Sequence, residues 1–277
     1  MSASNDPLRR AVDRRYGGQP TPPLPQAALN PVLETILGHR SVRRFAARPL
    51  PEHTLELIAA AAQSAPTSSN LQAMSIVAVT DPERKARLSV FAANQRQIAD
   101  APLLLMFVAD LARLRQVSAV AGQPGGGLDY LECFIVAVAD AAFAAQNALL
   151  ALQSVGLGGC YIGAMRNHPA EVAAELGLPP DAFAVFGLTV GYPDPAVETG
   201  VKPRLAQSIV LHHERYTPPE PAAIEAYDQT MNDFRTDQSM TDIAWSRQVS
   251  GRLRDPSALM GRDTIAATLR SLGFGLK

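Results

Sequence analysis

The stretch His39-Arg-Ser-Val-Arg-Arg-Phe45 is the most informative part of this 277-residue chain, and Lys202-Pro-Arg204 adds a second basic run far downstream. Arginine offers a planar fork of donors that suits phosphate oxygens, and Ser41 can donate to a phosphate or a sugar hydroxyl. A fold that brings the two runs together would hold a phosphate from two sides. The alternative is a solvated basic turn beside a basic loop, because short basic runs are common.

The bulk composition predicts one sizeable hydrophobic core. Hydrophobic residues make up 47% of the chain, charged residues make up 18%, and the formal net charge is −1. The near-zero charge argues against a nucleic-acid partner, which usually requires a basic surface. The longest apolar stretches, 103–109 and 134–139, are too short to span a bilayer, and no apolar segment follows the N-terminal arginines. We therefore expect a cytoplasmic protein with no membrane partner.

The sequence predicts no metal site and no catalytic side chain of its own. Cys133 and Cys160 are separated from each other, which favours reduced core residues, and His212-His213 lacks a second ligand pair at zinc spacing. Asp140, inside an apolar helix, is either a general acid or a hydrogen-bond partner of a neighbouring helix end or chain, and the second role is favoured. Scarce acid–base machinery fits an enzyme whose cofactor supplies the chemistry.

Helices and strands alternate along the chain with uneven connections, which predicts α/β or α+β with a single sheet covered by helices. Residues 1–27 are polar and broken by prolines, so they are predicted to be a flexible N-terminal extension before one domain, 28–277, with a C-terminal excursion. The expected helices are 31–38, 51–65, 82–91, 128–155, 171–176, 222–234 and 264–272. The expected strands are 74–80, 103–110, 160–165, 184–191 and 209–212.

Two further segments have a specific prediction. Residues 113–127 include Gly122, Gly125, Gly126 and Gly127, which indicates a mobile loop. The helix expected at 128–155 is apolar and alanine-rich on every face, so neighbours should surround it. Small alanines let a second helix approach closely, which makes this helix a candidate for the centre of a dimer interface.

Taken in order, several motifs resemble the nitroreductase-like FMN flavoproteins, in the branch of NADPH-dependent, oxygen-insensitive nitroreductases and flavin reductases. The resemblance covers about 33–245. The motifs that carry it are His39-Arg-Ser-Val-Arg43, Ser64-Ala-Pro-Thr-Ser-Ser-Asn-Leu-Gln72, Asn94-Gln95, Asp140 with Gln146-Asn-Ala-Leu149, Gly156-Leu-Gly-Gly-Cys-Tyr-Ile-Gly163, Arg166-Asn167, Phe186-Gly-Leu-Thr-Val-Gly-Tyr-Pro193 and Lys202-Pro-Arg-Leu205.

The resemblance implies an α+β nitroreductase-like fold, in which helices wrap a central mixed β-sheet and two subunits form an intertwined homodimer. It implies an FMN cofactor, NADPH or NADH as electron donor, and ping-pong transfer of two electrons to nitroaromatics, quinones or free flavins, with the flavin N5 as the reacting atom. Two alternatives remain: a reductase specialised for one natural metabolite, and a flavin-binding redox sensor or carrier without efficient turnover.

The resemblance also implies a set of FMN-binding residues. The phosphate would be held by Arg40, Lys202 and Arg204, and the ribityl chain or phosphate by His39 and Ser41. Arg43 would lie beside N1 and O2 of the flavin ring, where a fixed cation favours the anionic reduced form. The remaining contacts would come from Thr67, Ser69, Gln95, Tyr161, Ile162 and Gly163, with Thr67 and Ser69 supplied by the partner subunit.

From the residues alone, part of this set has another explanation. Residues 67–70 are ordinary turn formers, Gln95 suits a surface position, and 161–163 suit a core strand.

Two departures from the family pattern concern the residues beside the flavin ring and those that bind the electron donor. Ala164 stands where the branch usually has a second glycine. Arg235 alone aligns convincingly with the basic residues that grip the 2′-phosphate of NADPH, with Arg247 and Arg252 as possible substitutes. The sequence therefore predicts NAD(P)H binding at Arg235 but leaves the choice between NADPH and NADH open.

Overall fold

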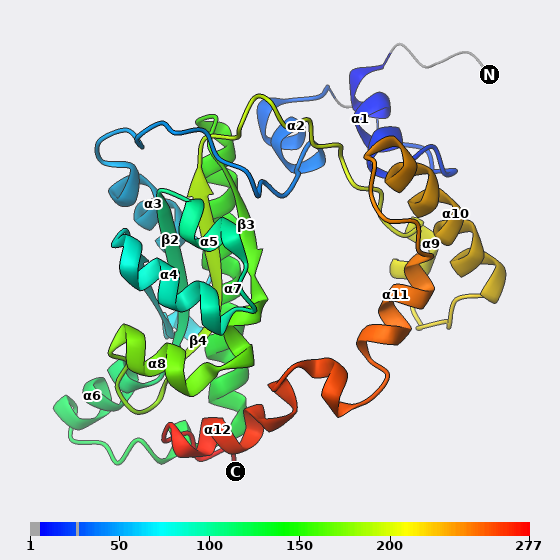
Figure 1. Ribbon diagram of the computed structural model, residues 1–277. Helices are drawn as coiled ribbons and strands as arrows, with labels where there is room; N and C mark the ends of the chain where they lie inside the picture. Colours follow the sequence, from blue (N-terminus) through cyan, green and yellow to red (C-terminus); the bar gives the residue numbers. More distant parts are fainter. Residues whose placement is uncertain (1–5, 26–27) are drawn as a thin grey trace. The chain divides into compact units, whose positions relative to one another are not determined.

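The computed structural model describes residues 6–25 and 28–277 (Figure 1). The chain divides into two compact units. One, here called the sheet unit, comprises 41–197 and 259–277. The other, here called the helical unit, comprises the chain up to residue 40 together with 198–258.

The sheet unit contains four strands, β1 (Met74–Val79), β2 (Leu103–Asp110), β3 (Gly158–Ile162) and β4 (Ala182–Gly191). They form one sheet in the order β1-β2-β4-β3, and every neighbouring pair is antiparallel. The α+β class is confirmed, but the expectation of a mixed sheet is wrong for these strands. The chain leaves β1 and β3 through helical connections and re-enters the sheet at the end where it left, which makes the next strand antiparallel.

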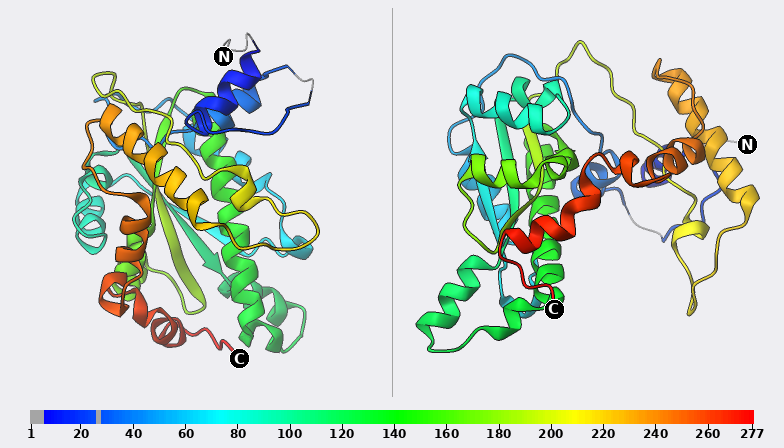
Figure 2. Two further views of the ribbon diagram at one scale, coloured as in Figure 1. Left: turned by 90° about the vertical axis from the view of Figure 1, so that its right-hand side faces the viewer. Right: turned by 60° about the horizontal axis from the view of Figure 1, so that its bottom comes forward.

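Helices cover both faces of this sheet (Figure 2). Residues along β2 alternate between two hydrophobic clusters, because successive side chains of a strand point to opposite faces. Leu105 and Phe107 join the cluster formed with α3 (Thr54–Gln63) and α7 (Leu131–Ser154). Leu104 and Met106 join the cluster formed with α4 (Pro82–Phe91) and α8 (Pro169–Leu176), beside the short α5 (Arg96–Asp100). Every residue of β2 is buried, as its continuous apolar sequence predicts.

Helix α7 is long and apolar enough, by length and composition alone, to cross a membrane. A core helix meets the same criterion, and α7 packs against α3 and the sheet. Its inner face is lined by fully buried alanines, including Ala137, Ala141 and Ala148, which allow this close approach. Its outer face leaves Leu131, Ile135 and Phe143 about half exposed.

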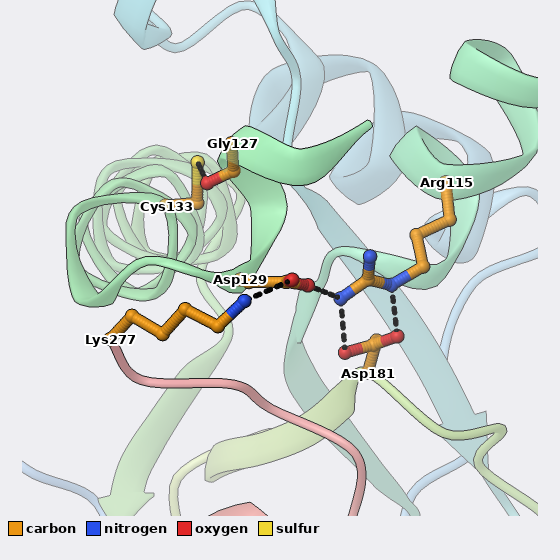
Figure 3. A network of polar contacts seen from close by, with 6 residues as sticks. All are labelled: Arg115, Gly127, Asp129, Cys133, Asp181 and Lys277. Carbon is orange, nitrogen blue, oxygen red and sulfur yellow. Dashed lines mark hydrogen bonds and ion pairs between the residues drawn. The ribbon is translucent and has the colours of Figure 1, made fainter. Parts of the chain in front are cut away.

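The C-terminal part of the sheet unit includes α12 (Ile265–Ser271). A further helix, α6 (Ala112–Val120), occupies part of the segment that is predicted from its glycines to be a mobile loop. That prediction is wrong for 113–120, which are helical, because the glycines begin only after the helix ends. Asp110 accepts a hydrogen bond from the backbone N–H of Arg113 at the start of α6. Arg115 then pairs with both Asp181 and Asp129, and Asp129 also pairs with Lys277 (Figure 3).

The helical unit contains α1 (Pro7–Arg15), α2 (Pro31–Leu37), α9 (Gln207–Val210), α10 (Pro221–Asp237) and α11 (Trp245–Arg252). Side chains of Asp6 and Asn30 cap the first turns of α1 and α2, each followed by a proline at the first helical position. The strand expected at 209–212 is wrong, since α9 occupies its start. Helix α1 lies within the predicted flexible extension and buries Leu8, Ala11, Val12 and Arg15.

The other predicted helices and strands are confirmed, with bounds that differ by no more than three residues at either end. Helices α5 and α11 are not foreseen. Both are short, and α11 follows a polar segment with little helical periodicity.

Candidate functional site

His39-Arg40 of the first basic run and Lys202–Arg204 of the second lie together in the helical unit, joined by Arg15. The guanidinium of Arg15 donates to the carbonyl oxygens of Leu37 (2.6 and 3.1 Å), His39 (2.7 Å) and Lys202 (3.0 Å). Its own carbonyl accepts a hydrogen bond from the backbone N–H of Arg204 at 3.0 Å. The predicted meeting of the two runs is therefore confirmed for His39-Arg40 and Lys202–Arg204.

The side chains at this junction carry positive charge toward solvent. Arg40, Lys202 and Arg204 are exposed, and His39 is half-buried. Arg40 donates to the carbonyl of Thr199 at 3.2 Å, and Arg204 donates to that of Lys202 at 3.3 Å. Both acceptors are uncharged backbone carbonyls, so these two hydrogen bonds do not neutralise the guanidinium groups of Arg40 and Arg204. An anion with several oxygens suits such a group of donors.

The electrostatics of Arg15 reflect the same excess of positive charge. Only 7% of Arg15 is exposed. Burial lowers the pKa of its guanidinium, and repulsion from Arg204 and Arg14 lowers that pKa further. The cluster is thus built of cations that repel one another.

Ser41 and Arg43 belong to the sheet unit and flank Val42, which anchors the segment there. Between them, Val42 is buried and its N–H donates to the carbonyl of Gly159 at 2.9 Å. A Cβ at Gly158 would lie 2.5 Å from Val42 Cγ2, so the close approach of this segment to β3 requires glycine. Arg43 is exposed beside this anchored residue.

The loop that carries Thr67 and Ser69 is held by Asp140 of α7. The Asp140 carboxylate, only 1% exposed, accepts the backbone N–H groups of Ser68 (3.1 Å) and Ala73 (2.9 Å). The structural role favoured for Asp140 by the sequence is therefore confirmed, with a loop as its partner. Thr67 is half-buried, and Ser69 is exposed with a left-handed backbone φ of 49°.

The remaining predicted FMN contacts also lie in the sheet unit. Gln95 is half-buried before α5, and its side-chain oxygen accepts from Gln97 at 2.7 Å. Tyr161 is 37% exposed and stacks edge-on against Phe186, whereas Ile162 is fully buried. A Cβ at Gly163 would lie 3.3 Å from the guanidinium of Arg166, which gives this glycine a packing reason as well.

Arg235, the residue predicted to meet NAD(P)H, is buried in the helical unit. It is 5% exposed, and its guanidinium donates to the carbonyl of Ile243 and to Gln248 at 2.5 Å. Its Nε is buried and has no partner among the described residues. These bonds tie α10 to α11 and to the segment between them, so Arg235 is held in place as a buried side chain.

Arg235 also lines a pocket of about 750 Å³ within the helical unit. Lys202 and Arg204 line the same pocket, together with aromatic and apolar side chains. The full lining is Tyr16, Lys202, Arg204, Leu205, Gln207, Val210, Leu211, Tyr227, Met231, Arg235, Trp245 and Gln248. The alternative cations Arg247 and Arg252, both on α11, are not part of this lining.

The sequence interpretation missed Arg15, because the segment was predicted to be a flexible extension. The signal was present. Asp6-Pro7 begins a helix, and Leu8, Ala11, Val12 and Arg15 recur at the spacing of one helical face.

Comparison with known proteins assigns the chain to a family. The Nitroreductase family model matches residues 36–128 and 132–192, and the model of the Nitroreductase family C-terminal domain matches 202–277. The match therefore extends beyond residue 245, where the resemblance in the sequence ends.

Individual relatives agree with this assignment. The NADPH-flavin oxidoreductase of Vibrio harveyi is 38% identical over 231 residues, which cover 83% of this chain and 93% of the relative. The FMN reductase (NADPH) of Bacillus subtilis is 38% identical over 227 residues, 80% of this chain and 90% of the relative. The solved structure of the Vibrio harveyi NADPH:FMN oxidoreductase complexed with NAD⁺ has a TM-score of 0.80 at 37% identity, covering 90% of this chain and 100% of that one. This chain belongs to the nitroreductase family.

Proposed function

We propose that this protein is an FMN-dependent NAD(P)H oxidoreductase that reduces nitroaromatics, quinones or free flavins by two-electron transfer. The observation that carries the proposal is the cation cluster at the junction of the two basic runs, where Arg40, Lys202 and Arg204 face solvent on a backbone joined by Arg15. Membership of the nitroreductase family supports it. So do the names of the relatives, which include an FMN reductase and an oxygen-insensitive NADPH nitroreductase of Salmonella typhimurium.

The donor set fits the phosphate of FMN. Arginine and lysine donors suit a phosphate dianion, and Ser41 and His39 would add neutral donors for the phosphate or the ribityl chain. When bound, FMN supplies the redox chemistry, taking two electrons from NAD(P)H and passing them to the acceptor.

Around the flavin ring, the proposed contacts come from the sheet unit. Arg43 would place a fixed cation at the pyrimidine end, and Gln95 would read that edge. Backbone at 161–163 would lie against the ring, and Thr67 and Ser69 would reach it from a partner subunit. The bond of Val42 to Gly159 of β3 and the anchoring of the 67–73 loop by Asp140 support rigid placement of these residues.

Arg235 is proposed to contact the phosphate of NADPH from the pocket of the helical unit. Its support is its position in that lining beside Lys202 and Arg204. A cation held by two hydrogen bonds is a fixed donor, which suits recognition of a phosphate.

The molecule is proposed to be a homodimer in the cytoplasm. The outer stripe of α7, with Leu131, Ile135 and Phe143 about half exposed, supports a contact with a second copy of the chain. Two free cysteines, Cys133 and Cys160, are consistent with a reducing compartment.

The alternative is a flavin-binding sensor or carrier, and one experiment separates the two. Purified protein with bound FMN is mixed with NADPH or NADH and then with a panel of acceptors, including nitrofurazone, a quinone and free FMN. Bleaching of the flavin absorbance followed by rapid recovery on acceptor addition, over many cycles, supports the enzyme. Bleaching with no acceptor turnover supports the sensor, and failure to bind FMN contradicts both.

A further inference from the structure

The N-terminal helix contacts the proposed phosphate site although it lies outside the family models, of which the first begins at residue 36. Apolar residues fix α1 in the helical unit, where Leu8, Ala11 and Val12 are 4–6% exposed. Just after the helix, a Cβ at Gly17 would lie 2.5 Å from Thr230 Cγ2 and 3.1 Å from Pro203 Cγ, so the chain passes close to α10 and to the second basic run.

Arg15, at the end of this helix, is the side chain that reaches both runs. One guanidinium spans acceptors on either side of the junction, with the carbonyls of Leu37 and His39 on one run and that of Lys202 on the other. The backbone hydrogen bond from Arg204 to the carbonyl of Arg15 closes the same connection.

We propose that Arg15 is a positioning residue for the cofactor phosphate, holding His39-Arg40 against Lys202–Arg204 so that their cationic side chains converge on one anion. This inference rests on the proposed function, since it assigns Arg15 to the FMN phosphate. The N-terminal segment is then a working part of the cofactor site.

The chemistry of the contact explains why arginine occupies this position. Its planar fork can donate to three carbonyls in fixed directions, whereas a lysine ammonium is a compact charge without that geometry. Burying a cation against uncharged acceptors costs solvation, and Arg204 and Arg14 add repulsion. A bound phosphate dianion offsets that repulsion, which couples the stability of the junction to phosphate binding.

The test compares FMN with riboflavin, which lacks the phosphate. Full-length protein is titrated with each flavin, and binding is followed by quenching of flavin fluorescence, for the parent, Arg15→Gln, Arg15→Lys and Arg14→Gln. Arg14 is the matched control, because it is the adjacent arginine of the same helix but is exposed. The thermal midpoint is also measured with and without inorganic phosphate.

We expect Arg15→Gln to weaken FMN binding by on the order of tenfold and to change riboflavin binding little. Residues that hold ligand-contacting groups in place have effects of about this size at other sites. Arg15→Lys should be intermediate, and Arg14→Gln should remain close to the parent. Inorganic phosphate should raise the thermal midpoint of the parent more than that of Arg15→Gln.

Three results would overturn the inference: an unchanged FMN affinity in Arg15→Gln, an equal loss for FMN and riboflavin, or the same loss in Arg14→Gln. If Arg15→Gln does not fold, Arg15→Lys is judged by the same criteria. A parent protein that binds no FMN would instead contradict the proposed function, so the two failures are distinguishable.

Discussion

At the scale of one residue, replacing Arg204, whose guanidinium is exposed, tests the phosphate site most directly. Its Nη1 donates to the nearby carbonyls of Lys202 and Pro203, which are uncharged. Arg204→Ala should therefore leave the protein folded but remove a charge-assisted contact to FMN, costing roughly 1.5–3 kcal/mol of binding. The measurement is the FMN dissociation constant, with the exposed Arg215→Ala of the same unit as control. Equal affinities for the parent and Arg204→Ala would remove this residue from the site.

Arg43 has a different readout, because its proposed role is electrostatic. A fixed cation near the pyrimidine end stabilises the anionic reduced flavin, so Arg43→Gln should lower the midpoint potential. A loss of about 1.4 kcal/mol corresponds to roughly 30 mV for a two-electron couple. Redox titration of Arg43→Gln, with its exposed neighbour Arg44→Gln as control, measures the shift. A potential identical to the parent's would rule the role out.

Arg235 combines a structural role and a proposed binding role, and a second contact between α10 and α11 separates them. Arg235→Ala removes two donors from a buried position, so we expect a stability loss of about 2–4 kcal/mol. It should also bring the NADPH-over-NADH ratio in kcat/KM close to one by raising KM for NADPH, because a phosphate remote from the transferred hydride binds equally in ground and transition states.

Asp228→Ala is the matched control for Arg235→Ala, since Asp228 also ties α10 to α11, by accepting two hydrogen bonds from Ser246, and is not part of the pocket lining. It should lower the thermal midpoint and leave the coenzyme ratio unchanged. If both variants change the ratio equally, Arg235 acts only by holding α10 to α11.

At the scale of elements, the ion-pair network of Figure 3 ties α6 to the turn before α7, to Asp181 directly before β4, and to Lys277. Hydrogen bonds from Lys277 and then Arg115 hold the pKa of Asp129 below its ordinary value of 3.8. A lowered folded-state pKa means that the ionised form stabilises the fold. That contribution is complete above pH 3.8 and is lost as the pH falls through the lower folded-state pKa.

Asp129→Asn should therefore lower the thermal midpoint at pH 5–7, and the gap between variant and parent should close below about pH 3.8. Thermal unfolding scans across this pH range measure the difference in midpoint between variant and parent. Asp100→Asn, whose partner Arg96 is largely exposed, serves as control and should show little gap at any pH. A gap for Asp129→Asn that persists at the lowest pH would mean that packing, and not charge, links these elements.

The elements that the sequence predicts well are those with a strong periodic pattern. The continuous apolar run of β2 and the long apolar α7 leave little choice of structure. Helix α6 is missed because its stability comes from Arg115 and its distant partner Asp181, a contact that local pattern cannot reveal. The segment 209–212 begins with Ile209 and Val210, which are β-branched, so local propensity predicts a strand. Instead α9 occupies its start, and the sheet formed by the described residues consists of β1–β4 alone.

The candidate site is predictable where its residues form contiguous motifs. His39-Arg40 and Lys202–Arg204 stand out by their charge, and the sequence supports the hypothesis that the fold brings them together. Arg15 could not be assigned in this way, because its role depends on three carbonyl acceptors, and any residue has a carbonyl. For Arg235, the residue type is visible in the sequence, but its burial is not, since the partners Ile243 and Gln248 become neighbours only when α11 folds back.

At the scale of the whole molecule, the outer stripe of α7 is the feature that a second copy of the chain would cover. Ile135 is 53% exposed and Phe143 is 50% exposed. They lie eight residues apart, about two helical turns, so they share one face. A half-exposed apolar stripe on an otherwise packed helix is typical of an association surface. Ile135→Glu would bury an unpaired carboxylate there, which is costly, so the dimer should dissociate.

The expected result is a shift from dimer to monomer mass in light scattering after gel filtration, with the thermal midpoint depending on protein concentration for the parent only. Val120→Glu provides the control, because Val120 is 90% exposed at the end of α6 and should tolerate the same charge. If Thr67 and Ser69 reach the flavin from the partner, Ile135→Glu should also weaken FMN binding. A parent that is monomeric at working concentration, or an Ile135→Glu variant that stays dimeric, would place the association surface elsewhere.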